Sequence, residues 1–234
     1  MKIMSFNAQH CLDYINQRID FDLFADTIRS IDADIVGLNE MRGEGPAGDY
    51  QAQVKILAEK LGLHYCFAKA IDVPNCGPYG NGLLSKHPIL SAETIPVPDP
   101  AARCSGKGYE SRCLLKAKVD VNGTVLTVCV IHFGLNPDEQ VNAVQTVLAS
   151  AEEERCILMG DFNVLPDDPV LSPIRAEMFD AAALFTEPKL SFPSDDPDRK
   201  IDYIFVSRDL QVTAADIPAI VASDHRPHTA EIML

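Results

Sequence analysis

The chain has 234 residues, of which 47% are hydrophobic, and its formal net charge is −14 at pH 7. Its length allows one large core and no linker or repeat divides it, so we expect a single domain over residues 1–234. No apolar run approaches the roughly 18 to 20 residues that cross a bilayer, so we expect no transmembrane segment. The acidity disfavours a general nucleic-acid binder, because such binding draws on lysine and arginine contacts to phosphates.

Short apolar runs rich in β-branched residues alternate along the chain with stretches of helical periodicity. The expected strands are Lys2–Asn7, Asp34–Leu38, Gly82–Ser85, Leu114–Val121, Val125–His132, Cys156–Met159 and Ile201–Val206. The expected helices are Phe21–Ile31, Gln53–Leu61 and Asp138–Glu154. Because strand–helix units mix with strand–strand hairpins, two packed sheets flanked by helices fit better than a parallel doubly wound sheet. We therefore expect an α/β sandwich.

Three connections are long and irregular in composition: Asp72–Tyr79, Pro96–Tyr109 and Ser191–Lys200. Such loops either shape a substrate cleft or are variable surface segments. Seven cysteines are scattered without CxxC spacing, which argues against a disulfide framework or a zinc site. Because the first seven residues also lack the apolar stretch of a signal peptide, we expect a cytoplasmic protein. The oligomeric state is not indicated by the sequence.

Asp161 and Asn163 directly follow the predicted strand Cys156–Met159. Residues two apart in an extended chain share a face, so the two side chains place an acceptor beside a donor. This pair suits hydrolysis of a phosphate ester, with Asp161 orienting or deprotonating water and Asn163 holding a phosphoryl oxygen or the nucleophile. The same Gly-Asp-x-Asn pattern is also common in turns, so the pair alone does not identify a site.

Near the C-terminus, Asp224 and His225 follow an apolar segment and precede a proline, as in a strand-end active-site loop. A histidine that acts as an acid or base needs a partner that fixes its tautomer, and a carboxylate does this. Asp202 is the candidate partner, because it is an acid in an otherwise apolar strand. The alternative for Asp202 is a structural salt bridge with Arg199 or Lys200.

Three further polar residues lie at the ends of predicted strands. Glu40 follows Asp34–Leu38, where a carboxylate is well placed for a hard cation that prefers oxygen ligands. Asn7 ends the first strand, and its amide could bind the same ion or a phosphate oxygen. His132 ends Val125–His132. Taken singly, the first two also fit capping roles, and a lone strand histidine is often a hydrogen-bonded core residue.

In this order, these segments resemble the endonuclease/exonuclease/phosphatase superfamily, which includes DNase I-like nucleases, inositol polyphosphate 5-phosphatases and bacterial sphingomyelinases. The resemblance covers nearly the whole chain, and the ordered set of segments is specific although each one is commonplace. The segments are Ser5-Phe6-Asn7, Gly37-Leu38-Asn39-Glu40, Gly80-Asn81-Gly82-Leu83-Leu84-Ser85, Arg112, Ile131-His132, Gly160-Asp161-Phe162-Asn163, Ile201-Asp202-Tyr203 and Ser223-Asp224-His225.

The resemblance implies a DNase I-like, four-layered α/β sandwich with two mixed sheets and a site at the top of both. It implies that Glu40 binds Mg²⁺ or Mn²⁺, with Asn7 and Asp224 supporting the ion or positioning phosphate. Arg112 would neutralise the phosphate, and Asn7 and Asn163 would contact it as well. Tyr203 is expected to be a packing residue.

The catalytic residues implied by the resemblance are His132, Asp161, Asn163, Asp202 and His225. Asp161 and Asn163 would align the attacking water, while Asp202 would orient His225 toward the phosphate or the nucleophile. His132 would contact phosphate or help to protonate the leaving oxygen. The metal would polarise the phosphoryl group, and donors would meet charge that grows in the transition state.

A shared catalytic centre does not fix the substrate. Gln9 stands two residues past Asn7, where the abasic-site endonuclease branch usually has an acid, which disfavours abasic-site repair. The segment Ile131–Leu135 and the helix after it look like small bacterial members, some with lipid-related substrates. We therefore expect a phosphodiesterase or phosphatase acting on a small-molecule or lipid-derived phosphate ester. The alternative is a DNA or RNA endo- or exonuclease, and a scaffold without catalysis is disfavoured because the acids and histidines are present.

Overall fold

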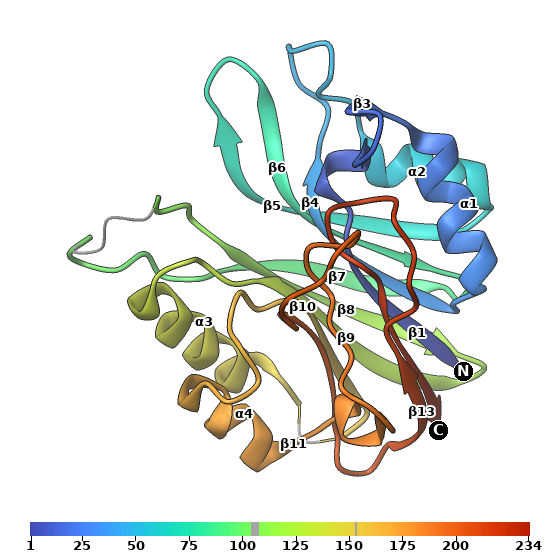
Figure 1. Cartoon of the computed structure of the whole chain (residues 1–234), viewed down its shortest axis with the longest axis vertical. Helices are drawn as coiled ribbons and strands as arrows, with labels where there is room; N and C mark the ends of the chain where they lie inside the picture. The colour runs from blue at the N-terminus through green and yellow to red at the C-terminus, as the bar shows by residue number, and fades with distance from the viewer. Residues whose placement is uncertain (104–107, 153) are drawn as a thin grey trace.

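The computed structural model describes residues 1–103, 108–152 and 154–234. Two six-stranded mixed sheets lie face to face, and helices cover the outer face of each (Figure 1). Across sheet 1 the strands are β13 (Gln211–Asp216), β14 (His228–Met233), β1 (Lys2–Asn7), β4 (Ile35–Arg42), β6 (Gly77–Ser85) and β5 (His64–Val73). Across sheet 2 they are β11 (Met178–Asp180), β12 (Asp202–Ser207), β10 (Cys156–Asp161), β9 (Thr124–His132), β8 (Cys113–Val121) and β7 (Ile89–Pro96). The predicted four-layered α/β sandwich is confirmed.

Two helices pack on each sheet (Figure 1). They are α1 (Phe21–Ile31) and α2 (Gln53–Leu61) on sheet 1, and α3 (Pro137–Ser150) and α4 (Ser172–Glu177) on sheet 2. Short elements complete the fold: β2 (Leu12–Asp13), β3 (Arg18–Ile19), η1 (Gln9–Cys11), η2 (Pro169–Leu171) and η3 (Ala181–Leu184). Among the described residues, none of the helices combines the length and apolarity that a membrane span requires.

The helix ends follow from local sequence. The Asp20 carboxylate accepts a hydrogen bond from the Leu23 backbone N–H at 3.0 Å, which caps α1. At the start of α3, the Glu139 carboxylate accepts from the Asn136 backbone N–H at 3.2 Å, with Pro137 in the first turn. Helix α3 is shorter than the predicted Asp138–Glu154, because the backbone after Ser150 becomes extended. Residue 153 of that prediction lies outside the described residues.

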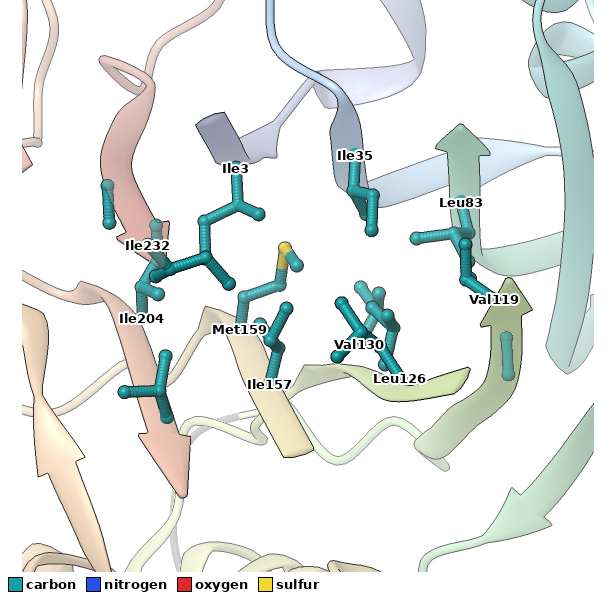
Figure 2. Packing of buried hydrophobic residues seen from close by; sticks show 14 of the residues in the cluster. Ile3, Ile35, Leu83, Val119, Leu126, Val130, Ile157, Met159, Ile204 and Ile232 are labelled. Carbon is teal, nitrogen blue, oxygen red and sulfur yellow. The ribbon is translucent and has the colours of Figure 1, made fainter. Parts of the chain in front are cut away.

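Strand side chains alternate between the layer that joins the sheets and the layers under the helices. Figure 2 shows part of the joining layer, which is mostly aliphatic and includes Ile3, Ile35, Val130, Met159 and Ile204. Their neighbours in sequence point the other way, toward the helices: Met4, Val36, Cys129, Leu158 and Tyr203. Both faces of these strands are therefore buried, as continuous apolar runs predict.

The same alternation places polar side chains between the sheets at one edge. Moving two or four residues from each apolar residue of the joining layer leads to Asn7, Asn39, His132, Asp161 and Asp202. The pairing brings these strand ends together, because Asn7 is opposite Asn39 in parallel strands. Asp161 is opposite both His132 and Asp202. Because alternate residues of a strand share a face, the same face that is apolar inside the molecule ends in a cluster of polar side chains at the edge.

The prediction missed β5, β7, β13 and β14, and it placed the start of β6 too late. The interpretation of Asp72–Tyr79 as an irregular loop was wrong, because β5 and β6 form a hairpin that pairs Val73 with Gly77. Strands β5 and β7 are sheet edges with half-exposed side chains, so they lack the apolar pattern of the central strands. Ser191–Lys200 is irregular as predicted. Residues 104–107 of Pro96–Tyr109 lie outside the described residues.

At Gly160, β10 lies too close to the backbone of the paired strand β9 to leave room for a side chain. Its φ is +150°, and a Cβ atom would lie 1.8 Å from the Ile131 carbonyl oxygen. We expect Gly160→Ala to lower the free energy of unfolding by about 2 kcal/mol or more, because backbone must move to relieve the overlap. Urea unfolding measures this loss. Gly48→Ala is the control, since a Cβ there meets nothing within 4 Å; equal stability of both variants would contradict the prediction.

Candidate active site

The polar edge is organised by a buried amide that connects the sheets. Asn39 on β4 accepts a hydrogen bond from the Asp161 backbone N–H at 2.9 Å through Oδ1. Its Nδ2 donates to the Ile131 carbonyl at 2.9 Å and to Asn81 Oδ1 at 2.8 Å. Asn81 in turn donates to the Cys113 carbonyl at 2.9 Å. A side chain of sheet 1 therefore holds the backbone of sheet 2 in place at Asp161.

Asp161, Asp202 and His225 form a buried cluster beside this amide. His225 Nδ1 lies 2.9 Å from Asp202 Oδ2, and His225 Nε2 lies 3.6 Å from Asp161 Oδ2. Phe192 packs against the imidazole, with the ring centroids 4.8 Å apart. Lys200 donates to the Asp202 backbone carbonyl at 3.0 Å, and Arg199 pairs with Asp198, so the Asp202 carboxylate faces histidine rather than either cation. The predicted contact between Asp202 and His225 is present.

The environment sets the protonation states of this cluster. Burial raises the pKa of Asp161 to about 7, although the His225 charge opposes the shift. Burial alone would lower the pKa of His225, but the carboxylates of Asp202 and Asp161 raise that pKa to about 10. At neutral pH, His225 is therefore a cation beside an acid whose pKa is near the working pH.

His132 faces Asp161 from the other side. Its Nδ1 lies 3.2 Å from Arg112 Nη1, and its Nε2 lies 3.5 Å from Asp161 Oδ2. Because a guanidinium only donates, Nδ1 accepts and the neutral ring carries its proton on Nε2. Burial and the Arg112 charge lower the pKa of His132 well below its ordinary value. Asn163 Nδ2 lies 3.2 Å from Nε2, but two donors cannot bond each other. The Asn163 amide therefore donates to the Phe133 carbonyl at 3.1 Å, and the His132 Nε2–H faces Asp161.

Asn7, Glu40 and Asp224 form the more open side of the site. Asn7 Nδ2 donates to Glu40 Oε1 at 3.0 Å and to Asp161 Oδ2 at 3.1 Å, so this amide connects the two groups. Burial, and next to it the negative charge of Glu40, raise the pKa of Asp224, while His225 opposes the shift. The Asn7 Oδ1 is turned away from Glu40 and accepts from the Gln9 backbone N–H at 3.1 Å. The half-buried carboxylates of Glu40 and Asp224 have the ligand chemistry of a hard divalent cation site.

The structure thus brings all nine predicted site residues to one edge: Asn7, Glu40, Arg112, His132, Asp161, Asn163, Asp202, Asp224 and His225. The sequence-based site omitted Asn39 and Asn81, although both occur in the quoted motifs. It also omitted Tyr79, whose phenol pKa is raised by burial and by a hydrogen bond to Glu40. The alternation of β4 could have identified Asn39, because Ile35 and Asn39 share a face.

A family model described as "Endonuclease/Exonuclease/phosphatase family" matches residues 4–225. Uncharacterized protein YbhP of Escherichia coli K12 is 24% identical over 253 residues, which cover 100% of this chain and 96% of that protein. A structure described as endonuclease/exonuclease/phosphatase from Beutenbergia cavernae superposes with a TM-score of 0.81 at 24% identity, covering 100% of this chain and 71% of that one. A mannosyl-6-phosphatase of Bacteroides thetaiotaomicron gives 0.78 at 18% identity, covering 100% of both chains. These likenesses support the fold.

The His225 ring provides a test of the buried cluster. We expect it to stay protonated through neutral pH, because its pKa is raised from 6.5 to about 10 despite burial. The stability contributed by its carboxylate partners is complete below pH 6.5 and is lost as the pH rises through about 10. NMR titration of the histidine ring signals in EDTA measures the pKa. Asp202→Asn should lower it, and a midpoint near 6.5 in the unaltered protein would contradict the assigned geometry.

Proposed function

The chain belongs to the endonuclease/exonuclease/phosphatase family, and on this premise we propose that it is a divalent-metal-dependent phosphoesterase acting on a small-molecule or lipid-derived phosphate ester. The observation that carries the proposal is the position of Asp161 between two histidines, with Oδ2 3.5 Å from His132 Nε2 and 3.6 Å from His225 Nε2. Their surroundings lower the pKa of His132 and raise that of His225, which favours one neutral and one cationic ring. Such an arrangement supplies an acceptor for a proton of water and donors for phosphoryl oxygens. Hydrolysis of phosphoester bonds is the chemistry of the superfamily.

We assign the metal to Glu40 and Asp224, with Asn7 supporting Glu40 through its Nδ2. When bound there, Mg²⁺ or Mn²⁺ would polarise the phosphoryl group and offset its negative charge. Asp161, Asp202 and His225 also have suitable ligand atoms, within 4.8 Å of one another. In that cluster, however, His225 Nδ1 is already engaged by Asp202 at 2.9 Å. A protonated His225 cannot ligate a metal, so the carboxylates of Glu40 and Asp224 are the better cation site, and the buried cluster is the better proton-handling site.

In this proposal, each buried residue has a distinct part in the reaction. Asp161, with a pKa of about 7, accepts a proton from the attacking water, while Asn163 holds the water or a phosphoryl oxygen. His225, kept cationic by Asp202, donates to the phosphoryl oxygen where charge accumulates. His132 donates from Nε2 as a neutral ring, which suits contact with phosphate better than service as a strong acid. Arg112, whose Nη1 also donates to Glu110 at 2.5 Å, stabilises that tautomer.

The proposal is tested by measuring phosphate release and oligonucleotide cleavage with one preparation. The panels are sugar and lipid phosphates on one side, and single- and double-stranded DNA and RNA on the other. We expect turnover with small or lipid esters, which EDTA stops and Mg²⁺ or Mn²⁺ restores. Glu40→Gln should raise the Mg²⁺ concentration needed by about tenfold, because it removes a ligand charge. Cleavage confined to nucleic acid would favour the nuclease alternative, and activity indifferent to EDTA would overturn the metal assignment.

Two substitutions test the proton-handling residues. Asp161→Asn removes the acceptor, and His225→Gln removes the cation while keeping a donor toward Asp202. We expect each to lower kcat by about a hundredfold or more, the usual contribution of a positioned acid or base. Circular dichroism and thermal unfolding confirm that the variants are folded. Asp167→Asn, which neutralises an exposed acid outside the cluster, is the matched control; full activity of Asp161→Asn would exclude the proposed mechanism.

A further inference from the structure

A hollow of about 350 Å³ adjoins the candidate active site. Its walls are Leu135, Asn163, Leu165, Asp198, Arg199 and Ile201. A second hollow of about 560 Å³ adjoins it, and Leu165, Asp198 and Arg199 line both. We call the first hollow, which Asn163 lines, the groove. Asn163 lines the groove and its Nδ2 lies 3.2 Å from His132 Nε2, so the groove offers space for the alcohol portion of a phosphate ester held at the histidines.

The groove has an apolar wall that is open to solvent. Leu135 is 42% exposed and Leu165 is 49% exposed, and both are among the large hydrophobic side chains that the fold leaves uncovered. Exposed apolar side chains are ordinary when scattered, but here they flank a hollow beside convergent polar groups. Such a wall gains free energy when a ligand displaces water from it.

The cations along the groove and the adjoining hollow already have partners. Arg199 makes a two-pronged contact with Asp198, through Nε at 2.5 Å and Nη2 at 2.9 Å, and lies over the Phe192 ring. Lys189 pairs with Asp216 at 2.8 Å. Lys200 is buried, and its ammonium donates to the Asp202 carbonyl at 3.0 Å. A second phosphate entering these hollows would therefore meet neutralised cations together with the negative charge of Asp198 and Asp167.

We propose that this groove is a subsite for the uncharged, hydroxylated ring of a sugar phosphate monoester, and that the Asp198–Arg199 pair excludes substrates with a second phosphate. The proposal rests on the proposed phosphoesterase function. A volume of about 350 Å³ is at the small end of ligand sites, which suits one ring rather than a polymer. The aliphatic wall matches the C–H face of a sugar, and the outer atoms of the ion pair can bond its hydroxyl groups.

The test compares three substrates with Mg²⁺: mannose 6-phosphate, glycerol 3-phosphate, which lacks a ring, and fructose 1,6-bisphosphate, which has a second phosphate. We expect mannose 6-phosphate to have the highest kcat/KM, by about tenfold over each of the others. Leu165→Asp should raise KM for mannose 6-phosphate by about tenfold with little change in kcat, because it charges the apolar wall. The KM for glycerol 3-phosphate should stay within about twofold, since that substrate does not fill the groove.

Asp198→Asn provides a second, independent variant. It leaves Arg199 unpaired, so the preference for the monophosphate over the bisphosphate should shrink by about fivefold or more. Asp167→Asn removes an acid of the adjoining hollow without releasing an arginine, so it should shrink the preference by no more than about twofold. Both acids are exposed, so neither substitution creates a cavity in the core.

The possible results separate the two proposals. Absence of hydrolysis with every phosphate ester would overturn the proposed function itself. Hydrolysis of phosphate esters with unaltered substrate preference in Leu165→Asp and Asp198→Asn would overturn the subsite alone. The subsite would also be overturned if the unaltered protein preferred the bisphosphate or an oligonucleotide, or if it cleaved lipid esters but no sugar phosphate.

Discussion

The hydrogen bonds of Asn39 connect the two halves of the molecule at the place where chemistry is proposed. The side chain belongs to sheet 1, yet two of its partners are backbone groups of sheet 2, the Asp161 N–H and the Ile131 carbonyl. It is fully buried, so loss of these bonds would leave polar groups without water or partner. The amide therefore fixes how the sheets are aligned along their strands. That alignment decides whether Asn7 of one sheet can reach Asp161 of the other.

Close approach of the sheets is what allows so short a side chain to span them. Gly37 lies against Met159 and Val130, and a Cβ atom on it would come within 2.6 Å of the Met159 sulfur. Asn39 is two residues further along the same face of β4. The absence of a side chain at Gly37 thus brings β4 near β10 and places the following amide within hydrogen-bonding distance. The hydrogen bonds of Asn39 at this edge therefore depend on the close packing of the sheets at Gly37.

The sequence predicts the central strands and their end residues because both faces of these strands are buried, which produces continuous apolar runs followed by a polar residue. It does not reveal the half-exposed edges β5 and β7, whose composition resembles that of loops. Contacts between the sheets are also hidden from sequence patterns. Asn39 and Glu40 are neighbours in the chain, yet Asn39 is buried against β10 and Glu40 is half-buried. This difference follows from the pairing of β4 with β1 and from the approach of β4 to β10. The groove walls come from three separate loops, which no local pattern brings together.

The acidity of the chain and the binding of a phosphate are reconciled by how the charges are distributed. Asp161 and Asp202 are 2% and 0% exposed, so their charge acts on the two histidines at short range and is hidden from the surface. Asp202 uses one carboxylate oxygen for His225, and among the described residues its Oδ1 has no hydrogen-bond partner. The imidazolium is therefore the main compensation for that buried charge, and the carboxylate is in turn the reason that the ring remains cationic. Acidic residues in this fold generate the positive group that an anionic substrate requires, and a global charge of −14 does not oppose it.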